Sequence, residues 1–143
     1  MRVALVVDDD PDLGDVITFV LERAGFEVHL EPDGAAGFAV AATLRPNVVL
    51  LDWMMPHMSG LEMCRALRSN IEFSSTAVIM LSARAQEGDI REGYSAGVDD
   101  YIIKPFRPRD LADRVEAVLA RSQSDRSNSP TKLAPEKEVK DDQ

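Results

Sequence analysis

The sequence contains a single cysteine, Cys64, and this scarcity excludes an intramolecular disulfide, a CxxC motif and a Cys/His metal set. A chain of 143 residues with 45% hydrophobic residues can bury a core without such cross-links. The composition therefore favours one domain in a reducing compartment, and we expect a cytoplasmic protein.

Long apolar runs are also missing. Met1 is followed by Arg2 and a short apolar run, and no stretch approaches the roughly 18–20 apolar residues that cross a bilayer. We therefore expect neither a signal peptide nor a membrane anchor.

Basic residues are in the minority, because 16 Lys and Arg stand against 25 Asp and Glu. The formal net charge of −9 creates a field that repels phosphate backbones, so we do not expect direct nucleic-acid binding by this chain. A basic partner or a cation fits this charge better.

The first 121 residues alternate short β-branched apolar runs with amphipathic stretches, which is typical of βα units that build a parallel sheet. Three of the runs are almost continuously apolar, as strands covered by helices on both faces are, and we expect these to be central. The predicted strands are residues 3–7, 26–30, 47–51, 77–81 and 101–103, of which the first, third and fourth are the continuous ones. The predicted helices are residues 11–24, 34–44, 60–69, 86–96 and 108–121.

The boundaries of these helices carry the expected residue types. Pro11 and Pro108 suit first helical turns, and Gly25 and Gly97 stand where a left-handed residue would end a helix. The sequence thus predicts an α/β domain over residues 1–121.

Composition changes at residue 122. Residues 122–143 are rich in serine, proline and charge, and their apolar candidates are few: Leu133, Ala134 and Val139. Such a segment buries too little surface to order itself, so we expect a disordered tail or a linker.

Polar residues follow the predicted strands. In an open parallel α/β sheet the ligand site lies beyond the carboxyl ends of the strands, so these residues are the candidates for chemistry. They are Asp8, Asp9 and Asp10 after the first strand, Asp52 after the third, Ser82 after the fourth, and Lys104 with Pro105 after the fifth.

Carboxylates packed this closely repel one another and favour a bound cation. Oxygen-only ligands select a hard ion, and Mg²⁺ binds one or two carboxylates and completes its shell with water and phosphate oxygens. A carboxylate can also act as the nucleophile toward phosphorus, with a metal, a lysine and a hydroxyl neutralising the charge of the phosphoryl oxygens. The set therefore predicts phosphoryl transfer to an aspartate.

Five motifs together resemble the receiver domain of two-component response regulators over residues 2 to about 121. They are VVDDDPD, LLDWMMPHMSG, MLSAR, AGVDDYIIKPF and DLADRVEAVL. The resemblance implies a flavodoxin-like, doubly wound, five-stranded parallel sheet with strand order 2-1-3-4-5 and five helices. It also implies a domain that is phosphorylated rather than an enzyme acting on other substrates.

The resemblance assigns roles to single residues. Asp52 would be the phosphoacceptor, and Asp8, Asp9, Asp52 and the backbone carbonyl of Met54 would hold Mg²⁺. Ser82 would hydrogen-bond the phosphoryl group and Lys104 would pair with it, with a cis bond between Lys104 and Pro105.

Further roles concern switching and lifetime. Tyr101 would turn inward when Ser82 moves. Met54 and Arg84 would flank the path of the hydrolysing water; Met54 cannot orient that water, so we expect a long-lived phosphorylated state.

The resemblance also implies partners. We expect a sensor histidine kinase or a phosphotransfer protein as the phosphodonor, and homodimerisation or partner binding through the fourth helix, fifth strand and fifth helix. The motifs look more like receivers attached to winged-helix DNA-binding domains than free-standing chemotaxis receivers, so an output domain beyond the tail and a separate output partner both stay open.

Simpler interpretations apply to other polar residues. Asp10 and Asp12 precede or begin a helix and are predicted to cap it. Solvated or packing roles are predicted for His29 and His57. Cys64 is predicted to be a small buried hydrophobic residue. Two residues with a functional role also have a simpler alternative. Tyr101 could be a half-buried packing residue, and Lys104 could be a solvated loop lysine.

Two alternative functions remain. A phosphatase of the haloacid-dehalogenase type would use Asp8 as nucleophile, and the spacing Asp8-x-Asp10 superficially fits it, but this function leaves Asp52 without a role. The other alternative is a receiver-like interaction module that takes no phosphate. The complete set of site residues argues against it: Asp8, Asp9, Asp52, Ser82 and Lys104.

Overall fold

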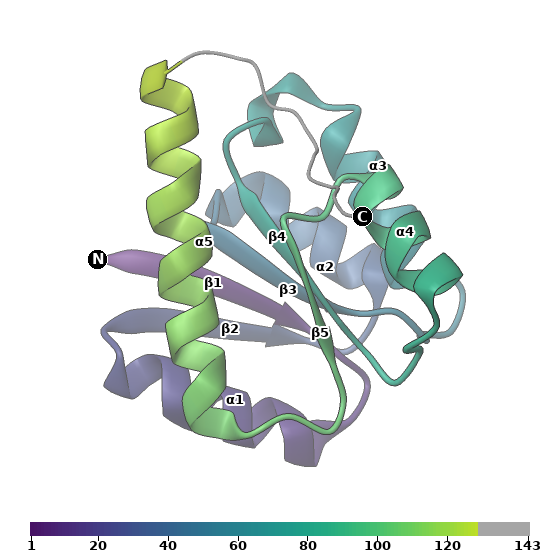
Figure 1. Ribbon diagram of the computed structural model, residues 1–143. Coiled ribbons are helices and arrows are strands. Elements are labelled where there is room, and N and C mark those ends of the chain that lie inside the picture. Colours follow the sequence, from purple (N-terminus) through teal and green to yellow (C-terminus); the bar gives the residue numbers. More distant parts are fainter. Residues whose placement is uncertain (129–143) are drawn as a thin grey trace.

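The computed structural model describes residues 1–128 and contains one five-stranded sheet in which every neighbouring pair of strands is parallel. The strand order is β2-β1-β3-β4-β5, as predicted (Figure 1). The strands are β1 (Arg2–Val7), β2 (Phe26–Glu31), β3 (Val48–Asp52), β4 (Ala77–Ser82) and β5 (Asp100–Ile103).

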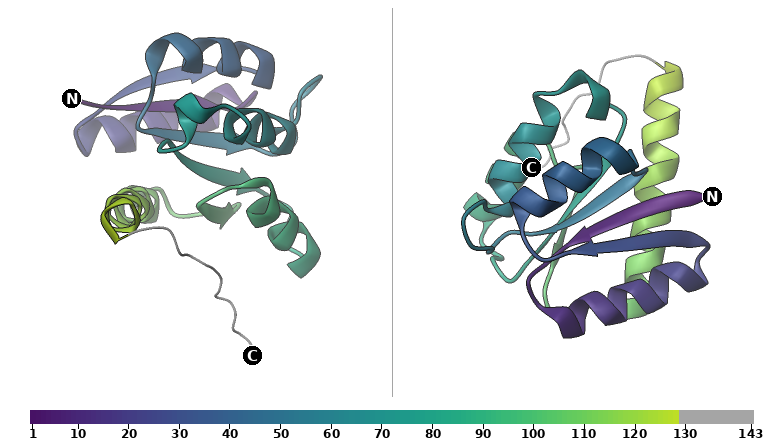
Figure 2. Two further views of the ribbon diagram at one scale, coloured as in Figure 1. Left: turned by 90° about the horizontal axis from the view of Figure 1, so that it is seen from above. Right: turned by 180° about the vertical axis from the view of Figure 1, so that it is seen from behind.

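Helices cover both faces of the sheet. Figures 1 and 2 show α1 and α5 on one face and α2 and α3 on the other, and α3 packs beside α4. The helices are α1 (Pro11–Arg23), α2 (Gly34–Leu44), α3 (Gly60–Arg68), α4 (Glu87–Ala96) and α5 (Pro108–Asn128), with a short 3₁₀ helix η1 (Ile71–Phe73) before β4.

Two hydrophobic clusters, one on each face, explain why the central strands are continuously apolar. Successive side chains of a strand point to opposite faces, so Ala4 and Val6 of β1 join the cluster under α1 and α5. Leu5 and Val7 join the cluster under α2, α3 and α4. All four are fully buried, as a strand covered on both sides requires.

Local capping chemistry fixes several helix ends. The Asp10 side chain accepts hydrogen bonds from the backbone N–H groups of Asp12 and Leu13, which confirms its predicted capping role. Gly97 ends α4 with φ 112°, the left-handed conformation predicted for it. Ser59 and Glu62 form a reciprocal capping box at α3 that the sequence analysis did not identify.

The predicted strands agree with the structure to within one residue at each end, whereas α5 differs more. This helix continues to Asn128 rather than ending at 121, because neither proline nor glycine interrupts the chain before Pro130. The rest of the predicted tail lies outside the described residues.

Among the helices of residues 1–128, none is both long and apolar enough to cross a bilayer. The cytoplasmic location stays a prediction.

Candidate functional site

The candidate site forms where β1, β3 and β4 end side by side. The strand register places Val7 beside Leu51 and Asp52 beside Leu81, so Asp8, Asp52 and Ser82 occupy neighbouring strand ends. Backbone hydrogen bonds extend this alignment, because the N–H of Lys104 donates to the Ser82 carbonyl over 2.8 Å. The sheet itself therefore brings the predicted residues together.

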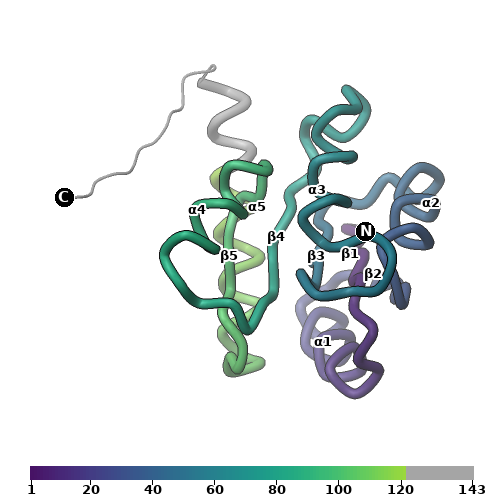
Figure 3. The backbone as a smooth tube through the Cα atoms, turned by 90° about the vertical axis from the view of Figure 1, so that its right-hand side faces the viewer, coloured from purple at the N-terminus to yellow at the C-terminus, as the bar shows by residue number. Residues whose placement is uncertain are grey.

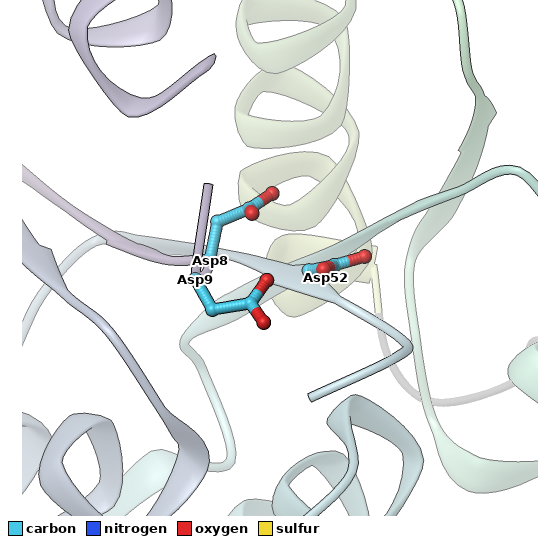
Figure 4. Close-up of side chains that lie close together, drawn as sticks. All are labelled: Asp8, Asp9 and Asp52. Carbon is cyan, nitrogen blue, oxygen red and sulfur yellow. The ribbon is translucent and has the colours of Figure 1, made fainter. Parts of the chain in front are cut away.

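Three carboxylates share one space at these strand ends. Oxygen atoms of Asp8, Asp9 and Asp52 lie within 4.8 Å of one another, and in the described part of the chain no other group of His, Cys, Asp or Glu meets this criterion. Figure 4 shows Asp8 and Asp9 leaving adjacent backbone positions with their carboxylates on the side of Asp52. Asp8 and Asp52 are buried and Asp9 is exposed, so the group opens to solvent on one side.

Lys104 supplies the positive charge of the site. Its Nζ lies 3.3 Å from Oδ2 of Asp8 and 3.2 Å from Oδ1 of Asp52. Burial lowers the pKa of this ammonium, but attraction to Asp52 and Asp8 outweighs burial and leaves the pKa raised. Lys104 is thus a permanently charged member of the site and not a solvated loop lysine; the bond to Pro105 is cis, as the resemblance implied.

The acidic group lacks enough positive charge to balance it. Burial, and then repulsion from Asp8, raises the pKa of Asp52, and Lys104 only partly offsets these effects. A divalent cation held by oxygen atoms would relieve this repulsion, and the donor set of three carboxylates suits Mg²⁺. The residues therefore fit the predicted metal.

Ser82 and Tyr101 are joined through the backbone of Arg84. Ser82, which is buried, accepts a hydrogen bond from the Arg84 N–H over 2.9 Å. The Tyr101 hydroxyl donates to the Arg84 carbonyl over 2.7 Å, and its ring is already buried. Tyr101 also packs edge-on against Trp53, with ring centroids 6.1 Å apart.

The side chain of Arg84 lies beside the acceptor strand. Its guanidinium sits 4.6 Å from the centre of the Trp53 ring and donates to the Met54 sulfur over 3.7 Å. It also pairs with Asp89 on α4, with nitrogen–oxygen distances of 3.2 and 3.3 Å. Sequence reasoning missed Trp53 and Asp89; the only available signal was a tryptophan directly after the acceptor.

Gly60 allows α3 to begin against the backbone of the acceptor. A Cβ at this position would lie 2.2 Å from the Asp52 carbonyl oxygen, closer than any side chain tolerates. The Gly60 N–H donates to the Trp53 carbonyl over 3.0 Å, which fixes the turn after Asp52.

Residues predicted to have simpler roles lie outside the acidic group. Asp10 is a helix cap, His29 contacts Glu27 over 2.6 Å, and His57 is exposed in the loop after β3. Cys64 is buried, and burial raises the pKa of its thiol to about 11. Neither histidine belongs to the group formed by Asp8, Asp9 and Asp52.

A family model provides the deciding comparison. Residues 4–116 match the response regulator receiver domain, which is most of the described chain. The chain belongs to this family. The resemblance carried by its motifs is thereby confirmed, and so is the predicted flavodoxin-like fold.

Curated relatives of this receiver domain include transcriptional regulators. The DNA-binding response regulator MtrA of Mycolicibacterium smegmatis is 41% identical over 121 residues, which are 85% of this chain and 52% of the relative. The phosphate regulon transcriptional regulatory protein PhoB of Pseudomonas aeruginosa is 36% identical over 132 residues, 92% of this chain and 58% of that protein. The receiver therefore spans a little over half the length of these two relatives.

Solved structures agree with the fold. The chemotaxis response regulator CheY4 of Vibrio cholerae superposes with a TM-score of 0.79 at 30% identity, covering 82% of this chain and 98% of that one. Nearly all of that chain thus corresponds to the domain described here.

Proposed function

We propose that this receiver domain takes a phosphoryl group onto Asp52 from a histidine kinase or a phosphotransfer protein, with Mg²⁺ bound, and thereby switches its interactions with partners. The observation that carries the proposal is the group of three carboxylates within 4.8 Å, with the Lys104 ammonium on both Asp8 and Asp52. A nucleophile, a cation site and a fixed positive charge are the parts that phosphoryl transfer needs.

The transfer step follows from these positions. An Asp52 carboxylate oxygen attacks the phosphorus of a phosphohistidine, an O–P bond forms, the N–P bond breaks, and the imidazole leaves. Lys104 pairs with the phosphoryl oxygens, and the Ser82 hydroxyl donates a hydrogen bond to one of them. Asp8, Asp9, Asp52 and the Met54 carbonyl would hold Mg²⁺, which supplies further neutralisation of the phosphoryl charge when bound.

The direct experiment is incubation of the chain with a small phosphodonor such as acetyl phosphate. Intact mass should rise by one phosphoryl group in the presence of Mg²⁺ and should stay unchanged with a chelator, because the carboxylates repel an approaching dianion. Phosphorylation that proceeds equally well in chelator would contradict the role given to the metal.

The alternative phosphatase function has less support. Asp10, which that mechanism needs beside Asp8, is occupied in capping α1. Asp52 would have no function in such an enzyme although it lies in the acidic group. Release of phosphate from an added phosphomonoester would favour the phosphatase over the proposal.

The register of the acidic pair can be tested by two substitutions one residue apart. Asp9→Ala removes a carboxylate from the group, so we expect Mg²⁺ affinity to fall on the order of tenfold or more. Asp10→Ala removes a helix cap, which costs about 1 kcal/mol of stability but leaves the metal site intact. Titration with Mg²⁺, followed by the fluorescence of Trp53, the single tryptophan, measures the metal affinity of both variants. Equal losses of affinity in the two variants would mean that the acidic pair is misassigned.

Switching is proposed to act on the surface formed by α4, β5 and α5, which Figure 3 shows together at one side of the molecule. Tyr101 on β5 connects the site to this surface, because its hydroxyl binds the residue that also binds Ser82. Since the ring is already turned inward, phosphorylation would act by stabilising this arrangement over alternatives.

Association through that surface is expected to depend on exposed apolar residues. Ile103 on β5 is 40% exposed, so Ile103→Glu should abolish the dimer that a phosphoryl mimic such as beryllofluoride induces. Phe19→Glu on α1, where the side chain is 63% exposed, is the matched control and should dimerise as the unmodified chain does. Sedimentation velocity decides, and the reverse pattern would place the interface on α1.

The lifetime of the phosphorylated state is proposed to depend on Met54. Its side chain is 61% exposed beside the acceptor and has no group that orients a water for attack on phosphorus. Met54→Asn should shorten the lifetime by about threefold to tenfold, because an amide can hold that water. Met54→Leu keeps the bulk without the amide and should decay at nearly the original rate; equal decay of all three proteins would refute the account.

Output is proposed to come from another domain or partner. The relatives named above are DNA-binding or transcriptional regulators about twice as long as the matched region, and the acidic charge of this chain disfavours DNA contact of its own. The reading frame of the gene beyond Gln143 would show whether an output domain follows α5 in the same chain.

A further inference from the structure

Arg84 has three different contacts besides its backbone bonds, and none was needed for the phosphoryl transfer described above. The guanidinium stacks on Trp53, touches the Met54 sulfur and pairs with Asp89. Trp53 and Met54 are the two residues that follow Asp52. The arginine therefore bridges the acceptor loop and the first turn of α4.

We propose that Asp89 is a positioning residue that holds Arg84 away from the acceptor until a phosphoryl group on Asp52 competes for the guanidinium. This inference rests on phosphorylation of Asp52, the function proposed above. Loss of the Arg84–Asp89 pair would then be the step that frees the start of α4.

The charges favour such a competition. The pair is partly solvated, with the Arg84 side chain 44% exposed, and ion pairs of this kind are weak. A phosphoryl group carries up to two negative charges and binds arginine through strong, bidentate hydrogen bonds. The guanidinium contacts Trp53 and Met54, the two residues after Asp52, which places it beside the loop that follows the acceptor.

The start of α4 is suited to respond when the pair breaks. Gln86, its N-cap residue, makes no side-chain capping bond, and Gly88 in the first turn adds conformational freedom. Asp89 is one of the two acids of that turn that favour the helix N-terminus, and Arg84 fixes its position. Arg84 also binds Ser82 and Tyr101 through its backbone, so one residue links the acceptor, the switch residues and α4.

The test compares two charge-neutralising substitutions in the same helical turn. Asp89→Asn removes the partner of Arg84, whereas Glu87→Gln removes an exposed acid that pairs with Arg91 over 3.9 Å. Freed from Asp89, the guanidinium should stay on the phosphoryl group, so Asp89→Asn should prolong the phosphorylated state by roughly threefold to tenfold. Glu87→Gln should decay at the rate of the unmodified chain, and Asp89→Glu should restore most of that rate.

Trp53 gives a readout that a purely structural role would not change. Before phosphorylation, the emission of Asp89→Asn should already differ from that of the unmodified chain, because the guanidinium over the Trp53 ring has lost the partner that holds it in place. If Asp89→Asn and Glu87→Gln match the unmodified chain in both lifetime and emission, the inference is wrong. If the unmodified chain gains no phosphoryl mass at all, the function proposed above fails instead.

Discussion

Asp52→Asn is expected to abolish phosphorylation by acetyl phosphate in saturating Mg²⁺. An amide oxygen is not a nucleophile toward phosphorus under these conditions, and the other two carboxylates of the site are assigned to the metal. Intact mass spectrometry should show one added phosphoryl group on the unmodified chain and none on the variant. A variant that still gained this mass would remove Asp52 as the sole acceptor.

The same variant must be shown to fold. Burial raises the pKa of Asp52, so the folded state binds a proton more tightly than the unfolded state, and ionising this residue costs stability as pH rises through its pKa. Replacing it with a neutral amide should therefore raise the melting temperature at pH 7 without Mg²⁺. The advantage should shrink as pH falls through the raised pKa of Asp52 and should be gone below the pKa of an ordinary aspartate. If the variant instead melts well below the unmodified chain, Asp52→Ala replaces it in the phosphorylation test.

Arg68→Ala is expected to cause the largest loss of stability among the substitutions considered. Arg68 donates hydrogen bonds to the carbonyls of Gly97, Phe73 and Thr76 and pairs with Asp99 over 2.9 Å, which joins α3, η1 and the starts of β4 and β5. Its side chain is only 23% exposed. Truncation removes four hydrogen bonds to partly buried acceptors, so the free energy of unfolding should fall by about 2–4 kcal/mol.

Arg65→Ala is the matched control for Arg68. Arg65 lies on the same helix, is largely exposed and approaches Glu92 only to 3.9 Å, so its loss should change stability by less than about 0.5 kcal/mol. Urea denaturation of both variants measures the difference. Equal effects would show that the Arg68 hydrogen bonds are replaced by water.

The strands and the acidic site were predictable because each rests on local sequence. Uninterrupted apolar runs mark central strands, and the residues directly after them must meet at one edge of a parallel sheet. The sequence alone therefore places Asp8, Asp52 and Lys104 together. Asp10 was separable from Asp9 because Pro11 marks a helix start.

Contacts made by long side chains across elements were not predictable in this way. Nothing in the sequence around Arg68 distinguishes it from Arg65. Arg68 nevertheless connects four segments through its hydrogen bonds, whereas Arg65 faces solvent. Asp99 and Asp100 likewise accept hydrogen bonds from Arg68 and Arg114, which lie far from them in the sequence. Partner choice of this kind depends on the relative position of distant elements, which residue patterns do not encode.

The end of α5 was misjudged for a different reason. Polar composition after residue 121 indicated an unstructured segment, but a helix already anchored by buried residues continues until a residue stops it. Leu111, Val115 and Val118 supply that anchor, and the residues up to Asn128 include no helix breaker.

Chemical mapping of the phosphorylated residue tests the central claim most directly. Borohydride reduces an aspartyl phosphate to homoserine and leaves ordinary aspartates intact, so the phosphorylated chain can be reduced, digested and sequenced by mass spectrometry. The account predicts homoserine at position 52 and aspartate at positions 8 and 9. Homoserine at position 8, with position 52 unchanged, would contradict it and would instead indicate a phosphatase-type nucleophile on β1.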